Sequence, residues 1–339
     1  MEKENGFIQS TVISTRIRLA RNFAAFPFPA KMDEQQASDV VYLVERGLDE
    51  LDEFKKYDME ELQEDEINLL QEAHLISPAL HRSKRGAAFV SKDNAISIMV
   101  NEEDHLRLQY IFPHYDVYKA YERISAVDES LGSMFDFAFD KKLGYLTACP
   151  SNLGTGMRAS VMMFLPGFAR SGGLKKLLPS LRKSGLTVRG AFGEGSTAEG
   201  YLYQISNERT LGLSEMELLD QMNEAMLSLC DLENREREKM MATSEVEIRD
   251  RCLRAYGALT HCAILPANEF LLKMADVKLG VLLGFFKTED LKEVHGFIDG
   301  MRPHSFRIAN GLRDLDERVC DEARASTVGR VLPELVQIK

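Results

Sequence analysis

The composition of the chain changes at Ser214, and this change limits its architecture more than any other feature. From there to about residue 335, Glu, Arg, Leu and Met dominate while Gly and Pro become rare, which is typical of helix. Before Ser214, strand and helix patterns interleave without a regular β-α-β alternation, which argues against a doubly wound parallel sheet. The sequence therefore predicts an α+β fold, with a sheet-bearing domain at 1–213 and a helical domain at 214–339.

Within the first domain, periodicity and turn signals place the individual elements. Asp33 is the expected N-cap of the first helix, and the turn-type cluster Lys92-Asp93-Asn94 predicts a hairpin. Helices are expected over 33–54, 59–73, 114–131 and 172–184, and strands over 7–18, 86–91, 95–101, 143–149, 157–166, 186–192 and 200–206.

Charge and cysteine content exclude several classes of protein. With 42 Lys+Arg against 53 Asp+Glu, the net charge is 42 − 53 = −11, which argues against a general nucleic-acid or membrane binder because both need a basic surface. The five cysteines are widely spaced and fit a reducing cytosol. The charged N-terminus lacks the apolar run of a signal peptide, and no stretch is long enough to span a membrane. We expect a cytoplasmic protein that meets anions through a local cluster of arginines.

Two arginines of the segment Ser14-Thr15-Arg16-Ile17-Arg18 are placed to hold phosphate. Residues two apart in an extended segment share a face, so Arg16 and Arg18 would lie side by side. Each guanidinium can donate paired hydrogen bonds to phosphate oxygens. The alternative interpretation is an edge strand with solvated surface charges.

Acidic residues cluster in Asn101-Glu102-Glu103-Asp104-His105-Leu106-Arg107. Adjacent carboxylates repel one another unless a cation or a proton is shared among them. Such a cluster can hold Mg²⁺, directly or through water, or supply a general base. A solvated charged turn is the alternative.

A thiol, a glycine-rich loop and a lone histidine complete the candidates. Cys149 follows an expected strand, and a hydrogen bond from Ser151 could stabilise its thiolate. The loop Arg189-Gly190-Ala191-Phe192-Gly193-Glu194-Gly195 lacks the Lys-Ser/Thr pair of a P-loop. An inert cysteine and a surface hairpin loop are the alternatives, and His74 caps a helix end by default.

Taken together, these residues suit an unusual ATP-dependent kinase. Phosphoryl transfer depends mainly on positioning and charge neutralisation, and the arginines at positions 16, 18, 107, 158 and 189 can provide both. A guanidinium acceptor is a planar cation that holds its protons firmly, because its pKa is above ~12. Carboxylates and a thiolate could clamp that plane and accept a proton from it.

The order of these motifs resembles the ATP:guanido phosphotransferases, the phosphagen kinase family that includes creatine and arginine kinases. The similarity runs from about residue 12 to residue 215. It implies a glutamine-synthetase-like catalytic fold, an antiparallel sheet flanked by helices, with ATP and Mg²⁺ as cofactors. It also implies that Glu103, as the base, and Glu194 grip the guanidinium beside Cys149, and that Glu102 and Asp104 hold the water shell of Mg²⁺. The ATP-binding positions it implies are Ser14, Thr15, Arg16, Ile17, Arg18, His74, Arg107, Arg158, Ala159, Ser160, Val161, Met162, Arg189, Gly190 and Gly193.

Departures from the small-guanidine kinases indicate the branch of bacterial protein-arginine kinases. Small-guanidine kinases carry a helical lid domain before the Ser-Thr-Arg motif, which here starts at Ser14, so we expect no such lid. Phe192 stands where those kinases usually carry another arginine. The tail segments Asp250-Arg251-Cys252-Leu253-Arg254-Ala255-Tyr256-Gly257 and Asp276-Val277-Lys278-Leu279-Gly280 also resemble this branch. An enzyme without a lid could admit an arginine within a polypeptide.

The same branch carries a C-terminal Arg-Asp-x-x-Arg-Ala motif associated with a second, phosphoarginine-binding site. The matching stretch here supplies Asp321 and Arg324, but Cys320 replaces the first arginine. Whether feedback by phosphoarginine survives this replacement is left open.

The resulting hypothesis is a protein-arginine kinase that forms phosphoarginine on proteins with exposed arginine. By resemblance it would act in a stress response with an activator protein and a Clp protease system, and without nucleic acid or membrane. The apolar tail stretches 277–286 and 291–298 indicate either a homodimer face or packing on the sheet. A kinase for a free small guanidine and a catalytically silent arginine- or phosphoarginine-binding adaptor are the alternatives.

Overall fold

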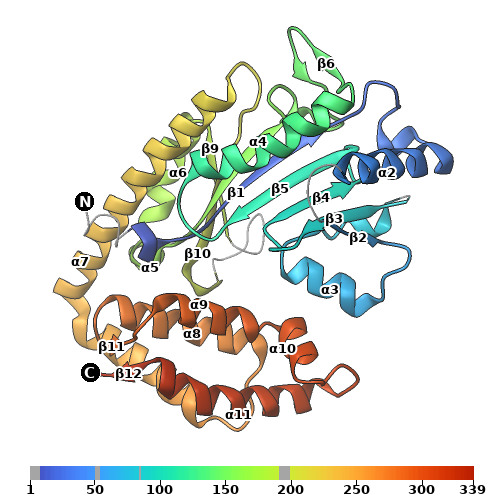
Figure 1. Ribbon diagram of the computed structural model, residues 1–339. Helices are drawn as coiled ribbons and strands as arrows, with labels where there is room; N and C mark the ends of the chain where they lie inside the picture. Colours follow the sequence, from blue (N-terminus) through green and yellow to red (C-terminus); the bar gives the residue numbers. More distant parts are fainter. Residues whose placement is uncertain (1–7, 50–53, 84, 191–198) are drawn as a thin grey trace. The chain divides into compact units, whose positions relative to one another are not determined.

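The computed structural model describes residues 8–49, 54–83, 85–190 and 199–339, which form two compact units (Figure 1). The units are interleaved along the chain. The first comprises Met1–Phe164, Lys175–Arg189 and Tyr203–Cys230, and the second comprises Leu165–Leu174, Gly190–Leu202 and Asp231–Lys339. The division between residues 213 and 214 stays a prediction.

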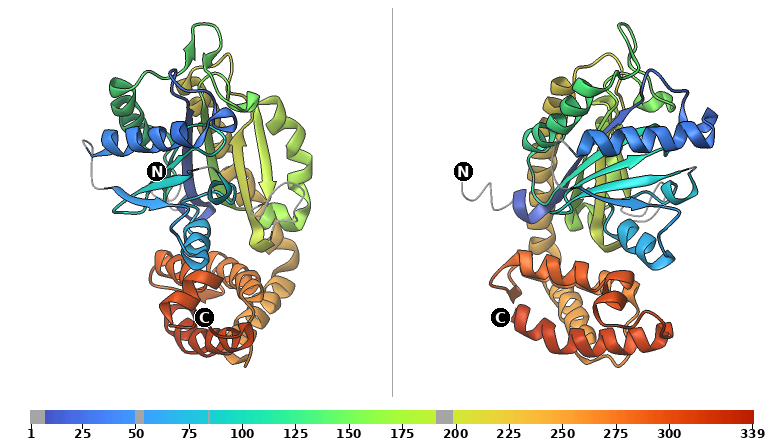
Figure 2. Two further views of the ribbon diagram at one scale, coloured as in Figure 1. Left: turned by 90° about the vertical axis from the view of Figure 1, so that its right-hand side faces the viewer. Right: turned by 45° about the vertical axis from the view of Figure 1, so that its right-hand side comes forward.

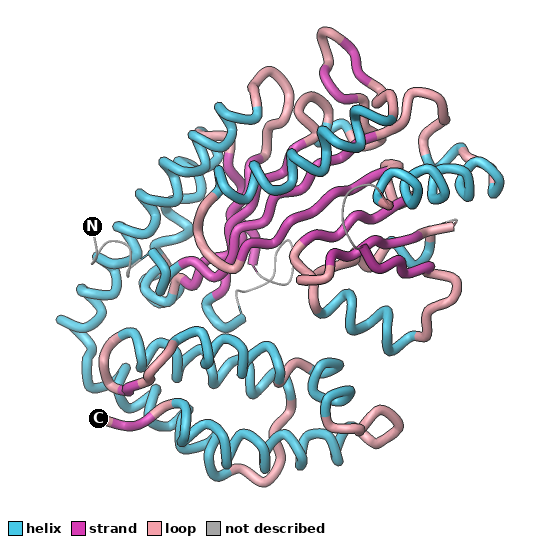
Figure 3. The backbone as a smooth tube through the Cα atoms, viewed as in Figure 1, coloured by secondary structure: helices cyan, strands magenta, loops and turns pink. Residues whose placement is uncertain are grey.

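An eight-stranded sheet forms the centre of the first unit (Figure 3). Its strand order is β2-β3-β4-β5-β1-β8-β10-β9. The strands are β1 (Val12–Arg21), β2 (Phe54–Asp58), β3 (Ala87–Ser91), β4 (Ile96–Val100), β5 (Leu106–Phe112), β8 (Met157–Phe164), β9 (Leu186–Gly190) and β10 (Leu202–Asn207). All pairs from β2 to β8 are antiparallel. The predicted α+β class, with an antiparallel sheet, is confirmed.

One face of this sheet packs against two helices to form an apolar core. Helix α4 (Val117–Met134) packs on β1 and β5 and against α2 (Glu34–Leu48) (Figure 2). Alternate residues of the strands, such as Ile17 and Leu108, point toward it and are fully buried. Arg21 of β1 forms a buried ion pair of 2.7 Å with Asp128 of α4 and stacks on the ring of Tyr145. This pair fixes the helix to the end of the strand. The first unit also contains α3 (Glu64–Glu72) and α6 (Gly173–Lys183), of which the first two residues belong to the second unit. Residues 8–11 are helical, where the sequence analysis expected the start of a strand.

Local signals placed some elements well and others poorly. Asp33 caps α2 through the amide of Gln36, and β3 and β4 form the predicted hairpin. The first helix, however, ends at Leu48, and 54–58 forms strand β2 instead. The expected strand at 143–149 is reduced to β7 (Gly144–Tyr145), which pairs with β6 (Phe139–Asp140) and forms a single bridge to Gly154. Strand β5 was not expected.

The second unit is mainly helical, as the composition of the tail predicted. Its helices, with α7 starting in the first unit, are α5 (Pro166–Ser171), α7 (Glu215–His261), α8 (Ala267–Leu282), α9 (Leu291–Gly300), α10 (Pro303–Ala309) and α11 (Glu317–Leu335). A short pair of strands, β11 (Phe286–Lys287) and β12 (Gln337–Ile338), lies beside them. The buried rings of Phe270, Phe286 and Phe306 contribute to its core. Among the described residues, no helix has the length and apolar character needed to cross a membrane.

Candidate functional site

Four arginines lie on the face of the sheet opposite the apolar core. Arg18 stands directly opposite Arg158 in the β1–β8 pair. Ala20, two residues along the same face, stands opposite Arg107 in the β1–β5 pair. Arg16 belongs to this face as well, because it is two residues from Arg18. We call Arg16, Arg18, Arg107 and Arg158 the arginine face.

The charges on the arginine face repel one another. Burial, followed by the charges of Arg158 and Arg107, lowers the pKa of Arg16 to about 10. Burial and the three neighbouring arginines lower the pKa of Arg18 well below its ordinary value, and Glu102 partly opposes this shift. Within the described residues, the Nε of Arg18 is buried and has no hydrogen-bond partner. A site that gathers several cations whose charges repel one another is suited to a polyanion.

Two adjacent glutamates at the edge of this face have different surroundings. The Glu102 carboxylate lies 2.7 Å from Nη1 of Arg107, accepts a hydrogen bond from Ser77, and is only 7% exposed. Glu103 is 45% exposed and lies 3.8 Å from Nη2 of Arg107. Glu102 therefore orients an arginine, whereas Glu103 is open to a bound molecule.

A buried amide holds the turn that carries these glutamates. The side chain of Asn22 donates to the Asp104 carboxylate at 2.6 Å and to the carbonyl of Leu146 at 3.0 Å, and it accepts from the amide of His105 at 2.9 Å. Asp104 also accepts from the amide of Ala148 at 2.7 Å. Asn22 and Asp104 thus join the glutamate turn to the segment that leads to Cys149.

Asn22→Ala should loosen this connection. It leaves buried polar groups without partners, so we expect the free energy of unfolding to fall by about 2 kcal/mol. We also expect the turnover number to fall more than the affinity for ATP. Denaturant unfolding and steady-state kinetics measure both effects. Asn234→Ala is the control, because Asn234 is only partly buried on α7 and its amide donates a single hydrogen bond of 3.2 Å to Glu238. Its free energy of unfolding should stay within about 0.5 kcal/mol of that of the wild-type chain. Equal stabilities of the two variants would contradict the role given to Asn22.

Cys149 and His74 lie beside the site. The thiol of Cys149 is half-buried and lies 3.0 Å from the hydroxyl of Ser151, the contact that the sequence suggested. His74 follows α3, and its carbonyl accepts a hydrogen bond of 2.7 Å from Gln109. Gln109 lies two residues from Arg107 on the arginine face. No described contact tests the roles that the sequence gave to Cys149 and His74.

The other predicted nucleotide positions divide between the two faces of the sheet. Ser160 and Met162 pair with Arg16 and Ser14 and so share the arginine face. Residues with side chains in the opposite, buried face are Thr15, Ile17, Ala159 and Val161. Arg189 and Gly190 end β9, which β10 separates from β8. Glu194, Gly193 and Phe192 lie outside the described residues.

The predicted second site lies in the second unit. Arg324 donates to Asp321 at 2.6 Å and to the carbonyl of Leu265 at 2.9 Å, and both side chains are buried. Cys320, one residue before Asp321, is also buried. The phosphoarginine role of Asp321 and Arg324 stays a prediction.

The acidic turn contains the carboxylates that the sequence analysis assigned to Mg²⁺. Among the described residues, no group of three or more His, Cys, Asp or Glu side chains could hold a metal ion. Mg²⁺ commonly binds through one or two carboxylates, with water and substrate phosphates as its other ligands. Glu102 and Glu103, beside cations that would attract phosphates, fit an ion that arrives with a nucleotide. Asp104 is buried and engaged with Asn22 and Ala148.

Some residues that shape this site escaped the sequence analysis. Gln109 had a usable signal, because it is two residues from Arg107 and shares its face in a strand. Ser77, which holds Glu102, and Ser206, which accepts from Arg158 at 3.0 Å, had none. Asn22, directly after β1, had no such signal either.

The chain is similar to known proteins of one enzyme family. The family model for the ATP:guanido phosphotransferase C-terminal catalytic domain matches residues 36–236, and the model for the protein-arginine kinase McsB C-terminal domain matches 245–337. The protein-arginine kinase of Bacillus velezensis is 41% identical over 290 residues, which are 84% of this chain and 80% of the relative. That of Caldanaerobacter subterraneus subsp. tengcongensis is 38% identical over 311 residues, 90% of this chain and 92% of the relative.

Solved structures show the same fold. A crystal structure of lombricine kinase aligns with a TM-score of 0.60 and 26% identity, covering 67% of each chain. The substrate-free duplicated taurocyamine kinase from Schistosoma mansoni aligns with a TM-score of 0.64 and 23% identity. In that case 79% of this chain is covered but only 40% of the duplicated protein.

Proposed function

The chain belongs to the ATP:guanido phosphotransferase family, and we propose that it is a protein-arginine kinase that transfers the γ-phosphoryl group of ATP to arginine side chains of proteins. The arginine face beside an exposed Glu103 carries this proposal. It combines a site for polyphosphate with a carboxylate open to a cationic acceptor. Family membership makes ATP the phosphoryl donor.

The arginine face holds the phosphates of ATP. Its four guanidinium groups neutralise the charge that spreads over the transferring phosphoryl oxygens, which is the main requirement of phosphoryl transfer. Glu102 keeps Arg107 in position, and Ser77 keeps Glu102 in position. Mg²⁺, when bound with ATP, would supply further charge neutralisation. Glu102 and Glu103 would hold its water shell, whereas Asp104 is engaged with Asn22 and Ala148.

Glu103 acts on the acceptor. Its carboxylate pairs with the guanidinium and takes a proton from the attacking nitrogen as the N–P bond forms and the bond from Pγ to the ADP oxygen breaks. Glu194 holds the other side of the guanidinium plane, with Cys149 beside it. Because both reactants are held in place, the reaction step avoids the entropic cost of bringing two free molecules together.

The acceptor is an arginine within a polypeptide. Support comes from the relatives named protein-arginine kinase and from the match of residues 245–337 to the C-terminal domain model of that branch. We further propose a cytoplasmic enzyme with a catalytic domain at 1–213 and a docking or dimerisation domain at 214–339. An activator protein and a Clp protease system would be its partners in a stress response.

The chemistry of the product tests this proposal. The chain is incubated with radiolabelled Mg-ATP and an arginine-rich protein, and the label on the protein is then exposed to acid and to base. An N–P bond predicts a label that acid removes and base does not. A label stable to acid would mean a hydroxyl acceptor, and no label with ATP still bound would favour the silent adaptor.

A further inference from the structure

The two tail segments that resemble the protein-arginine kinase branch meet in the second unit. Nε of Arg251, from the first segment, lies 2.9 Å from both carboxylate oxygens of Asp276, from the second. The hydroxyl of Tyr201 donates to the same carboxylate at 2.6 Å. None of these residues takes part in the proposed phosphoryl transfer, so their arrangement needs a separate explanation.

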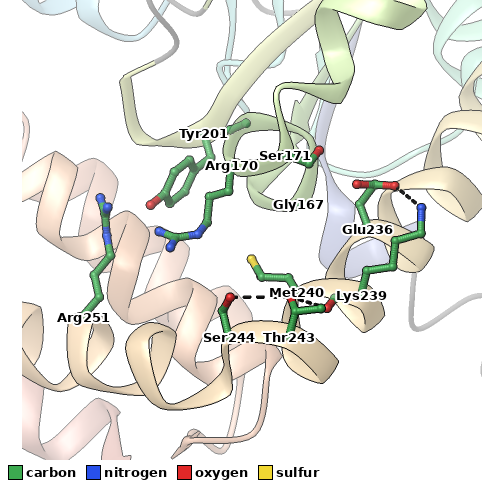
Figure 4. A pocket seen from close by; sticks show the side chains of 11 residues that line it. Gly167, Arg170, Ser171, Tyr201, Glu236, Lys239, Met240, Thr243, Ser244 and Arg251 are labelled. Atoms are coloured by element: carbon green, nitrogen blue, oxygen red, sulfur yellow. Dashed lines mark hydrogen bonds and ion pairs between the residues drawn. The ribbon is translucent and has the colours of Figure 1, made fainter.

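Arg251 and Tyr201 border a cavity of about 640 Å³ within the second unit (Figure 4). It is lined by α5, by the turn at Tyr201, and by α7 on both sides of Ser244, where the helical backbone angles are interrupted. Its lining includes Arg170, Ser171, Tyr201, Met240, Ser244 and Arg251.

Hydrogen-bond donors and cations dominate this lining. The only carboxylate in it, among the described residues, is Glu236, and Lys239 neutralises it at 2.6 Å. Arg170 and Arg251 add two guanidinium groups (Figure 4). In a chain with a net charge of −11, such a local excess of cations is a feature that composition alone would not produce.

The contacts around Asp276 orient the donors. Asp276 engages Arg251 through Nε alone, so the two terminal nitrogens stay available to a ligand. Burial and the hydrogen bond to Asp276 raise the pKa of Tyr201 to about 12, so its hydroxyl stays protonated. Asp276 thus serves as a support behind the cavity, and it fixes the direction in which Arg251 points.

We propose that this cavity is a binding site for a ligand with a phosphate-type dianion, held by Arg170 and Arg251 and by the hydroxyl groups of Ser171 and Ser244. Guanidinium forks match the geometry of phosphate oxygens, and hydroxyl groups supply further donors. The volume leaves room for a group larger than phosphate itself. This inference is independent of the proposed kinase activity, because it concerns binding in the other unit.

Met240 provides a reporter inside the cavity. The full-length chain is labelled with ¹³C at the methionine methyl groups, and the resonance of Met240 is assigned with Met240→Leu. Titration with inorganic phosphate should shift this resonance saturably. Phosphate bound to the arginine face would move other resonances instead, so the two sites are read separately. No shift of Met240 at concentrations that shift the other methyl groups would overturn the proposal.

Two variants and a matched control test the residues. Arg170→Gln and Arg251→Gln should each weaken the phosphate binding seen at Met240 about tenfold or more, because each removes a charge-assisted contact. Arg170→Gln does so without changing the contact of Arg251 with Asp276, and near-UV circular dichroism verifies that each variant is folded. Arg254→Gln is the control, since Arg254 lies on the same helix, pairs with Asp250 at 2.7 Å and does not line the cavity. Equal weakening of phosphate binding by all three variants would mean that binding depends only on the overall charge of the protein, and would refute the site.

The source of the phosphate group is decided by a second titration. Phosphoserine and phosphoarginine, as free amino acids, are compared with inorganic phosphate at the same Met240 resonance. Tighter binding of either amino acid identifies a phosphorylated side chain as the ligand, and equal binding identifies free phosphate. Binding of unmodified arginine as tight as that of phosphoarginine would contradict recognition of the dianion.

Discussion

Glu103→Gln should lower the turnover number about 10³-fold, within the range expected for loss of a general base. The reason is that the amide keeps the shape of the carboxylate but can neither accept the proton of the attacking nitrogen nor offset the charge of the guanidinium. ATP affinity should change less than about twofold, since Glu103 lies 3.8 Å from Arg107 and is 45% exposed. Initial rates and equilibrium binding of ATP measure the two quantities.

Glu102→Gln is the matched control, one residue away. Glu102 pairs closely with Arg107 and is nearly buried, so its replacement should weaken ATP binding as well as turnover. We therefore expect Glu103→Gln to lower turnover with little change in ATP affinity, and Glu102→Gln to lower both. Unchanged turnover in Glu103→Gln would remove Glu103 from the role of base.

Arg18→Met should stabilise the chain and weaken ATP binding at the same time. Arg18 is held among three other arginines, and burial together with their charges lowers its pKa. Methionine keeps most of the apolar stem without the charge, so the melting temperature without ligand should rise by about 2 °C, as a gain of about 1 kcal/mol would produce. ATP affinity should fall about 10²-fold, as expected for loss of a charged hydrogen bond of about 3 kcal/mol.

Thermal unfolding with and without ATP shows both effects in one experiment. The matched control is Arg123→Met on α4, whose side chain is exposed. It should change neither quantity appreciably. A lower melting temperature for Arg18→Met, with ATP binding intact, would mean that Arg18 supports the fold rather than the ligand.

How far the fold could be predicted depended on whether local signals agreed with tertiary demands. The hairpin of β3 and β4 was predictable because its turn residues and its alternation agree. Strand β5 was not expected, although Leu106, Leu108 and Tyr110 alternate with Arg107 and Gln109, which is the pattern of a strand with one polar face. Strand β2 (Phe54–Asp58), whose Lys55 and Lys56 are exposed, gave little strand signal.

The site was predictable as a set of residues but not as an arrangement. Alternation within one strand brought Arg16 and Arg18 to one face. The pairing of Arg18 with Arg158 is a matter of register between segments 140 residues apart, which no local pattern encodes. The resemblance to a known family was what assigned Arg18 and Arg158 to one site. The connection through Asn22 and Asp104 depends on the tertiary fold and left no trace in the sequence.

The central claim is that the acceptor is an arginine within a polypeptide. The most direct test is mass spectrometry of an arginine-rich protein incubated with the chain and Mg-ATP, with free arginine present as a competitor. We expect phosphate mapped to arginine residues of the protein, and little on the free amino acid. Phosphate mainly on free arginine would contradict this account and identify a kinase for small guanidines.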